Sequence, residues 1–248
     1  AEWLGPFRGA PAADRDALDE LLLRVSDVVC EMPWIEEMDL NPVLVDENGA
    51  TVVDARIVVR PWSPSARPYD HMAIHPYPAD LAGSLQLASG AVVTVRPIRP
   101  EDAELERAFV NGLSQQSRYL RFLYNMHEIS ASLLSRFTQI DYDRDMALVA
   151  LARDGRGERF VGVARYSRLS ETDECEFAVV VSDDWQGSGL AAPLMGRLVD
   201  TARDRGFRVM HGYVLRENRR MIAFVRRLGF EVRRDPDDAE LVRATLQL

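Results

Sequence analysis

The segment "DDWQGSGLAAPLMGRL", residues 183–198, places Gly187 and Gly189 directly before a stretch with the pattern of a helix. Glycine leaves the backbone bare, so a ligand can come close to the N–H groups there. The first N–H groups of a helix have no internal partners, and the helix dipole adds partial positive charge. Together these features predict a site for an anionic group, with a tight turn as the alternative. The spacing fits neither a Walker loop nor a dinucleotide-binding fingerprint.

An acidic cluster surrounds the segment before this loop. Glu174 and Glu176 lie two residues apart in "ECEFAVVV", residues 174–181, whose apolar and β-branched residues predict a strand. Side chains two apart on a strand share a face. Further acids lie close by in the sequence, and no basic residue lies among them: Glu171, Asp173, Asp183 and Asp184. Such a patch favours the approach of a cation such as a lysine side chain, with a solvated acidic surface as the alternative.

The elements that position these groups alternate from about residue 91 onward. Strand patterns occupy "AVVTVRPI", "DMALVALAR", "RFVGVARYSRL", "ECEFAVVV", "FRVMHGYVL" and "ELVRATLQL". Helix patterns occupy "RPEDAELERAFVNGL", "SRYLRFLYNM", "SASLLSRF", the stretch after Gly189 and "NRRMIAFVRRLGF". In the last of these, Asn218 is the expected N-cap and Gly229 follows the helix end. The alternation predicts a mixed α/β (α+β) fold, a mostly antiparallel sheet flanked by helices.

The first 60 residues have a separate pattern. Residues 14–31 carry apolar side chains at helical spacing, and residues 34–59 predict two strands joined by the turn "ENG". One helix and one hairpin bury little core. Residues 61–90 are rich in proline and fit neither period. We therefore expect a small domain at 1–60, a linker or strap at 61–90, and a larger domain at 91–248.

The composition excludes several classes of protein. The net charge is −9, which argues against nucleic-acid binding because that requires charge that neutralises phosphates. No apolar run approaches the ~18 residues of a membrane span, and the start lacks a signal-peptide pattern and a methionine. We expect a cytoplasmic piece of a longer protein, with Cys30 and Cys175 as reduced, buried thiols. The histidines show no ligand spacing, so no metal is expected: His71, His75, His127 and His211.

Gln186, Gly189 and Ala191 match a Q-x-x-G-x-G/A signature, by which the chain resembles the GNAT superfamily of acetyl-CoA-dependent acyltransferases. A second match is "NRRMIAFVRRLGF", which is similar to the closing helix of that family. The resemblance covers about residues 95–248 and implies acetyl-CoA as cosubstrate. It implies contacts to the pantetheine arm and pyrophosphate from Val179, Val180, Val181, Gln186, Gly187, Ser188, Gly189, Leu190, Ala191 and Asn218. Arg219 and Arg220 are candidates for the remaining phosphate charge, with solvated helix arginines as the alternative.

The same resemblance implies the catalytic roles. An acceptor amine with a pKa of ~10.4 must lose a proton before it attacks a thioester. The family pattern puts the general base at the position of Glu176, with Glu174 as second choice, and burial against a sheet would raise its pKa. Many members carry a tyrosine on the closing helix as general acid, but Val225 stands there. Either the thiolate leaves and takes a proton from water, or another group such as Tyr213 donates.

A second resemblance concerns the N-terminal part. The segment "EEMDLNPVLVDENGATVVDARIVV" is similar to the end of an ATP-grasp acyl-CoA synthetase subunit. In that family the positions of Asn41 and Asp54 ligate Mg²⁺, with Asp39 nearby. The half that grips the nucleotide is missing from this sequence, so we expect no ATP to bind. A degenerate synthetase region before a GNAT domain resembles the Pat subfamily of bacterial protein lysine acetyltransferases, as do "AIHPYP", "VRPIRPED" and "SRYLRFL".

These resemblances imply a protein lysine N-acetyltransferase whose target is a metabolic enzyme, such as an acyl-CoA synthetase. Acylation of a small amine or antibiotic is an alternative, and it predicts a deep, closed acceptor pocket. A non-catalytic acyl-CoA-sensing module is another, and it predicts coenzyme binding that does not depend on Glu176. All 30 basic residues are arginine. Either a GC-rich genome explains this, or an enzyme that modifies lysines benefits from having none.

Overall fold

The computed structural model describes residues 4–6, 11–61, 69–155, 157–170 and 172–248. The chain divides into two compact units, Ala1–Pro76 and Tyr77–Leu248. We had expected the linker to extend to residue 90. Instead, residues after Pro76 belong to the second unit, because Gly83–Gln86 forms a strand, β5, that pairs with β6, Val92–Pro97. The strand is only four residues long and follows several prolines, so its residues show no period-two pattern.

In its described residues, the first unit consists of one α-helix and two short ribbons. Its elements are α1 Arg15–Glu31, β1 Ile35–Leu40, β2 Val43–Asp46, β3 Gly49–Val52 and β4 Ala55–Val59. Asp14 caps the helix by accepting a hydrogen bond from the Ala17 N–H at 3.0 Å. The predicted turn between Asp46 and Gly49 is confirmed. The two predicted strands are each interrupted, however, because Pro42 has no N–H to donate to the ladder.

The first unit buries little apolar surface, as its size predicts. No residue of α1 is buried, and Leu22 and Leu23 are 59% and 66% exposed. Cys30 is half-buried, so the expectation of a fully buried thiol was wrong at that position. Cys175 lies in the second unit, is buried as expected, and is a free thiol. Burial raises the pKa of Cys175 to about 12, so it stays protonated.

The second unit is built on an eight-stranded sheet with the order β11-β12-β10-β9-β8-β7-β6-β5. The strands not yet given are β7 Asp145–Asp154, β8 Gly157–Arg168, β9 Glu174–Val181, β10 Val209–Leu215, β11 Glu231–Arg234 and β12 Leu241–Gln247. Neighbouring strands run antiparallel except β9 and β10, which pair in parallel. The predicted mixed, mostly antiparallel sheet is confirmed, and β11 is a strand that we did not predict.

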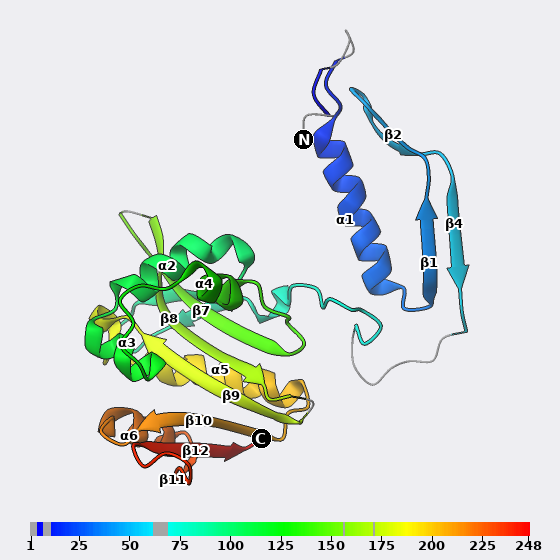
Figure 1. The fold of residues 1–248 in the computed structure, drawn as a ribbon. Helices are drawn as coiled ribbons and strands as arrows, with labels where there is room; N and C mark the ends of the chain where they lie inside the picture. The colour runs from blue at the N-terminus through cyan, green and yellow to red at the C-terminus, as the bar shows by residue number, and fades with distance from the viewer. Residues whose placement is uncertain (1–3, 7–10, 62–68, 156, 171) are drawn as a thin grey trace. The chain divides into compact units, whose positions relative to one another are not determined.

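Helices cover both faces of this sheet (Figure 1). The helical segments are η2 Ala79–Leu81, η3 Pro100–Asp102, α2 Ala103–Gly112, α3 Gln115–Phe122, α4 Ala131–Thr138, η4 Asp183–Trp185, α5 Ala191–Asp204 and α6 Arg219–Arg227. Helices α2, α3 and α4 lie on one face and α5 lies on the other. Strand β7 supplies both cores in alternation, since Met146 and Leu148 pack on the α5 side whereas Ala147 and Val149 pack on the α2 side.

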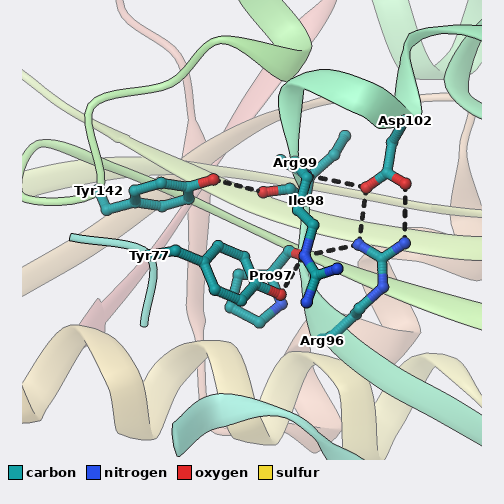
Figure 2. A network of polar contacts seen from close by, with 7 residues as sticks. All are labelled: Tyr77, Arg96, Pro97, Ile98, Arg99, Asp102 and Tyr142. Carbon is teal, nitrogen blue, oxygen red and sulfur yellow. Dashed lines mark hydrogen bonds and ion pairs between the residues drawn. The ribbon is translucent and has the colours of Figure 1, made fainter. Parts of the chain in front are cut away.

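A polar network fixes the segment between β6 and α2 (Figure 2). Arg96 donates two hydrogen bonds to the Asp102 carboxylate, both of 2.7 Å, and the Arg99 N–H donates a third at 2.8 Å. The Tyr142 hydroxyl donates to the Ile98 carbonyl at 2.7 Å. The Arg96 and Arg99 contacts lie within "VRPIRPED", and the Tyr142 contact joins this segment to the residues before β7. Together they hold the start of α2 against the sheet. Among the described helices, none has the length and apolar character needed to cross a membrane.

Candidate active site

Strands β9 and β10 pair over only three positions and then separate. The last pair is Glu176 with His211. Beyond it, β9 remains paired with β8 up to Val181, while β10 remains paired with β12 up to Leu215. The sheet therefore opens between its fourth and third strands, and the backbone of β9 has a free edge along the opening.

Phe177 of β9 and Gly212 of β10 lie in close contact directly after the last pair. A Cβ added to Gly212 would come within 2.7 Å of the Phe177 ring. The ring therefore occupies the space that any larger residue on β10 would need. The Phe177 ring also packs against Phe230 with a centroid distance of 4.9 Å, so it is held in place. Glycine at position 212 lets β10 pass close to an aromatic ring on β9.

The free edge of β9 presents alternate backbone groups to the opening. The Ser182 N–H donates to the Val161 carbonyl of β8 at 3.0 Å. Because backbone groups alternate in direction along a strand, the Val180 N–H also points toward β8. The N–H groups of Val179 and Val181 then point toward the opening. Of the three valines, Val179 and Val181 therefore have their N–H groups at the opening, and Val180 does not.

The glycine loop follows the end of β9 and precedes α5. Gly187 and Gly189 have φ angles of +82° and +88°, a region that favours glycine. A Cβ on either residue would meet nothing within 4 Å, so both backbones border open space. The Ser188 N–H donates to the Trp185 carbonyl, and the Leu190 N–H donates to the Ser188 hydroxyl. Helix α5 has no side-chain N-cap, so its first N–H groups remain available to an anion.

A cavity of about 920 Å³ joins these features. Its walls are the end of β9, the glycine loop, and parts of α3, α5 and α6. Of the ten residues that the sequence assigned to coenzyme contacts, all but Ser188 line it. Arg219 and Arg220 also line it, together with Arg227 and Arg121, which the sequence analysis did not single out. The volume is within the ~300–1,000 Å³ range of small-molecule sites.

Asn218 and Gln186 are both engaged in internal hydrogen bonds. The Asn218 side chain accepts from the Met221 N–H at 3.0 Å, which confirms it as the N-cap of α6. The Gln186 amide donates to Ser117 at 3.2 Å and to Asp183 at 3.3 Å. The Gln186 side chain therefore ties the loop to α3.

The two candidate bases have different surroundings. Glu176 is half-buried; burial raises its pKa, and the charge of Arg121 opposes the rise. Glu174 lies 3.7 Å from the His211 ring and 3.8 Å from the Arg243 guanidinium. Glu174 is therefore the carboxylate with ion-pair partners, and Glu176 is the one at the point of separation.

The acidic patch of the sequence is largely paired in space. Asp173 lies 3.6 Å from Arg208, and Asp184 pairs with Arg159. Asp183 accepts hydrogen bonds from Ser114 and Ser117. The basic partners come from distant segments, so the sequence around residue 180 did not reveal them. Glu171, the remaining member, lies outside the described residues.

Three further expectations concern a general acid and a metal. Val225 is fully buried in the core and cannot donate a proton. Tyr213 is 36% exposed on β10 and is not among the residues that line the cavity.

In the N-terminal unit, the Asn41 N–H donates to the Asp54 carbonyl at 3.1 Å. Across the described ranges, no group of three His, Cys, Asp or Glu side chains is arranged to hold a metal.

Comparisons with known proteins agree with this geometry. An acetyltransferase (GNAT) domain model matches residues 93–231, and an ATP-grasp domain model matches residues 1–59. An acetyltransferase of Pseudomonas aeruginosa is 44% identical over 162 residues, which cover 65% of this chain and 87% of that protein. The solved GNAT domain of PAT from S. lividans has a TM-score of 0.65 and 31% identity, covering 70% of this chain and 100% of that one.

The N-terminal unit has its own relatives. The ADP-forming acetate–CoA ligase I of Archaeoglobus fulgidus is 54% identical over 53 residues, which are 21% of this chain and 8% of the ligase. This chain therefore spans only a small part of the ligase. The sheet that opens between β9 and β10, the glycine loop and the family matches lead to one conclusion: the chain belongs to the GNAT family of acetyltransferases and carries an ATP-grasp fragment before its GNAT domain.

Proposed function

We propose that this protein is a protein lysine N-acetyltransferase that transfers the acetyl group of acetyl-CoA to a lysine of an acyl-CoA synthetase. One observation carries the proposal: Glu176, a half-buried carboxylate, lies where β9 and β10 separate, and Val179, three residues further along β9, lines the cavity that the glycine loop borders. A base and an anion site at one opening are what acyl transfer from a coenzyme A thioester to an amine requires.

The proposed chemistry begins with the acceptor amine. An amine with a pKa of ~10.4 is protonated at neutral pH, and Glu176 accepts its proton. The amine nitrogen then attacks the thioester carbon, and the carbonyl oxygen gains negative charge. The N–H groups of Val179 and Val181 are the proposed donors to that oxygen. As the C–S bond breaks, the nitrogen loses its second proton to water, the amide forms, and coenzyme A leaves as thiolate, which takes a proton from water because residue 225 is valine.

The residues present fit acetyl-CoA. Gly187 and Gly189 border open space at the start of α5, which suits the pyrophosphate. Arg219, Arg220 and Arg227 line the same cavity and provide positive charge for the phosphates. Asn218 lines it too, and we propose that its amide contacts the pantetheine arm as well as capping α6.

The choice of a protein as the acceptor rests on the fragment that precedes the GNAT domain and on the relatives of the GNAT domain. The chain carries an ATP-grasp fragment related to an acetate–CoA ligase, and its GNAT domain is related to that of PAT. We propose a synthetase of this class as the target, with the N-terminal unit contributing to its recognition. Acetylation of a small amine is the competing function.

The experiment that tests this choice measures thiol release from acetyl-CoA with two kinds of acceptor. One arm offers a purified acyl-CoA synthetase and the other offers small amines such as spermidine. Since this chain has no lysine, lysine acetylation in the mixture reports on the acceptor alone. We expect release with the synthetase and a lysine acetylation in its mass spectrum. Release only with small amines would support the competing function, and coenzyme binding without any release would indicate a sensor.

A further inference from the structure

Helix α3 lies lengthwise along the cavity. Three of its residues that line the cavity are Ser117, Leu120 and Arg121. Residues three or four apart share one face of a helix. At its first end α3 is tied to the glycine loop, because the Asp183 carboxylate accepts hydrogen bonds from the Ser114 N–H at 2.8 Å and from the Ser117 hydroxyl at 2.6 Å. This is the end of the cavity that suits the pyrophosphate.

The other end of α3 lies beside the middle of β9. Phe122, the last residue of α3, stacks on Phe137 of α4 with a centroid distance of 6.1 Å. The Arg165 guanidinium of β8 lies 3.8 Å from the centroid of the same Phe137 ring. Arg165 pairs in register with Ala178 of β9, so these contacts place the end of α3 close to the level of Ala178. Helix α3 therefore runs from the glycine loop back along β9 toward Glu176.

Arg121 precedes Phe122 at this second end and carries an unpaired positive charge. Its guanidinium lies over the Phe122 ring at 5.0 Å, and the residue lines the cavity. It forms no hydrogen bond or ion pair with any residue that the structure describes. Burial and then the charge of Arg165 lower its pKa to about 10, with Glu106 and then Glu176 opposing them. The guanidinium is therefore still charged at neutral pH.

Glu106 is a buried carboxylate on the same side of the sheet, and it has a partner of its own. Its Oε1 accepts a hydrogen bond from the Arg165 guanidinium at 3.1 Å, and the residue is only 2% exposed. Its Oε2 has no hydrogen-bond partner among the described residues. Glu106 does not line the cavity, whereas Arg121 does. Of these two charged groups, Arg121 is therefore the one that a ligand in the cavity can meet.

The place of Arg121 in the cavity separates it from the phosphate sites. Arg220 lies at the end of the glycine loop, because its guanidinium donates to the Gln186 side chain at 3.4 Å. Val179 lines the cavity one residue past Ala178, and its N–H is a proposed donor to the thioester carbonyl. The acyl group is attached through that carbonyl carbon. Arg121 therefore lies at the acyl end of the cavity, away from the glycine loop.

We propose that Arg121 binds a carboxylate at the far end of the acyl group, so that the enzyme also transfers a dicarboxylic acyl group, such as succinyl, from its coenzyme A thioester to an amine. This inference rests on the proposed function, since it uses the same cavity and the same base. A guanidinium donates two parallel hydrogen bonds to a carboxylate, and these charge-assisted bonds are stronger than neutral ones. Succinyl carries such a carboxylate, whereas acetyl ends in a methyl group.

The transfer step is the same as for acetyl. Glu176 accepts one proton of the acceptor ammonium, the amine nitrogen bonds to the thioester carbon, and the C–S bond breaks. The nitrogen loses its second proton to water, and coenzyme A leaves as thiolate. The terminal carboxylate keeps its charge and takes no part in the bonds that form and break. The product is an N-succinyl amide, which carries a negative charge where the acceptor lysine carried a positive one.

The test compares kcat/KM for succinyl-CoA, butyryl-CoA and acetyl-CoA, with one acyl-CoA synthetase as acceptor and with the full chain throughout. Butyryl-CoA has the carbon chain of succinyl-CoA with a methyl group in place of the carboxylate, so it controls for size. We expect wild type to prefer succinyl-CoA to butyryl-CoA. We expect Arg121→Gln to lower this ratio about tenfold or more, because a charge-assisted pair is lost.

Two further variants sharpen the test. Arg121→Lys keeps the charge but not the two parallel hydrogen bonds, and should give an intermediate ratio. Arg107→Gln, at an exposed arginine on α2, is the matched control and should leave the ratio unchanged. Titration of succinyl-CoA and butyryl-CoA without acceptor should show the same order of preference as the rates.

The remaining outcomes contradict the inference. An Arg121→Gln variant with the wild-type ratio of succinyl-CoA to butyryl-CoA would overturn it, whatever the rates. An equal loss with all three thioesters would make Arg121 a contact to coenzyme A or a part of the fold. A wild-type preference for butyryl-CoA would show that no carboxylate binds at this end. Failure of the proposed function is seen separately, as full acetyl transfer by Glu176→Gln.

Discussion

Glu176 of β9 lies opposite His211 of β10 in the last register before the two strands separate. One residue is half-buried and the other is 1% exposed, so an acid and a histidine share the point at which the sheet opens. The His211 ring accepts a hydrogen bond of 3.1 Å from Arg243 if its Nδ1 is unprotonated, which fixes the neutral tautomer with hydrogen on Nε2. Both residues are therefore in surroundings that oppose a charge.

The burial of His211 predicts a loss of stability on acidification. Its pKa is lowered by burial and then by Arg243, against the effect of Glu174. The unfolded chain then binds the proton more tightly, so the free energy of unfolding falls as pH drops below ~6.5, by at most about 1.4 kcal/mol per pH unit. Urea unfolding at pH 7.5 and 5.5 measures the slope. We expect His211→Asn to reduce it and the exposed control His127→Asn to leave it unchanged; equal slopes in all three proteins would contradict the prediction.

The contact between Gly212 and Phe177 predicts that position 212 does not tolerate a side chain. A Cβ at 2.7 Å from the ring requires Phe177 or β10 to move, so Gly212→Ala should lower the free energy of unfolding by about 1–3 kcal/mol. Gly196→Ala is the matched control, because a Cβ there meets nothing within 4 Å and alanine favours the interior of α5 by ~0.5–1 kcal/mol. Urea unfolding of both variants should give opposite signs. A neutral Gly212→Ala would show that β10 does not need glycine to pass the Phe177 ring.

The Asp183 contacts predict coupling between α3 and the glycine loop. Burial would raise the Asp183 pKa, but the hydrogen bonds from Ser117 and Ser114 outweigh it and lower the pKa. Asp183→Asn should weaken these bonds and speed hydrogen exchange of the α3 amides several-fold, as expected for the loss of about 1 kcal/mol at an exposed site. Asp184→Asn is the control, since Asp184 pairs with Arg159 and not with α3. If the α3 amides exchange at the same rate in both variants, Asp183 does not anchor α3 to the glycine loop.

Much of the second unit followed from local pattern. The strand predicted at residues 174–181 is β9 with the same bounds, and Asn218 caps α6 as expected, because both depend on short-range periodicity and capping. Strand β5 was missed because four residues after a proline-rich stretch show no period. The close fit of Phe177 against Gly212, next to the opening between β9 and β10, joins two distant segments, so no local pattern contains it.

The candidate site also has parts that the local sequence pattern predicts and parts that it does not. The glycine loop and its helix were visible in the sequence, since the anion site is made from adjacent residues. Arg121 was not, because it lines the cavity from α3, a helix far from the glycine loop in the sequence. The paired state of the acidic patch was missed for the same reason, since Arg159, Arg208 and Arg243 join it only in the folded chain.

The central claim is that Glu176 is the base for acyl transfer from acetyl-CoA. The most direct measurement is thiol release with an acyl-CoA synthetase as acceptor, for wild type, Glu176→Gln and Glu174→Gln, with coenzyme A affinity measured in parallel. Glu176→Gln should lower kcat about 10²–10⁴-fold with the affinity kept. Glu174→Gln should have a far smaller effect, because the Glu174 carboxylate has its own ion-pair partners. Turnover at the wild-type rate by Glu176→Gln would contradict the claim. A loss of the expected size in Glu174→Gln, without one in Glu176→Gln, would contradict it too.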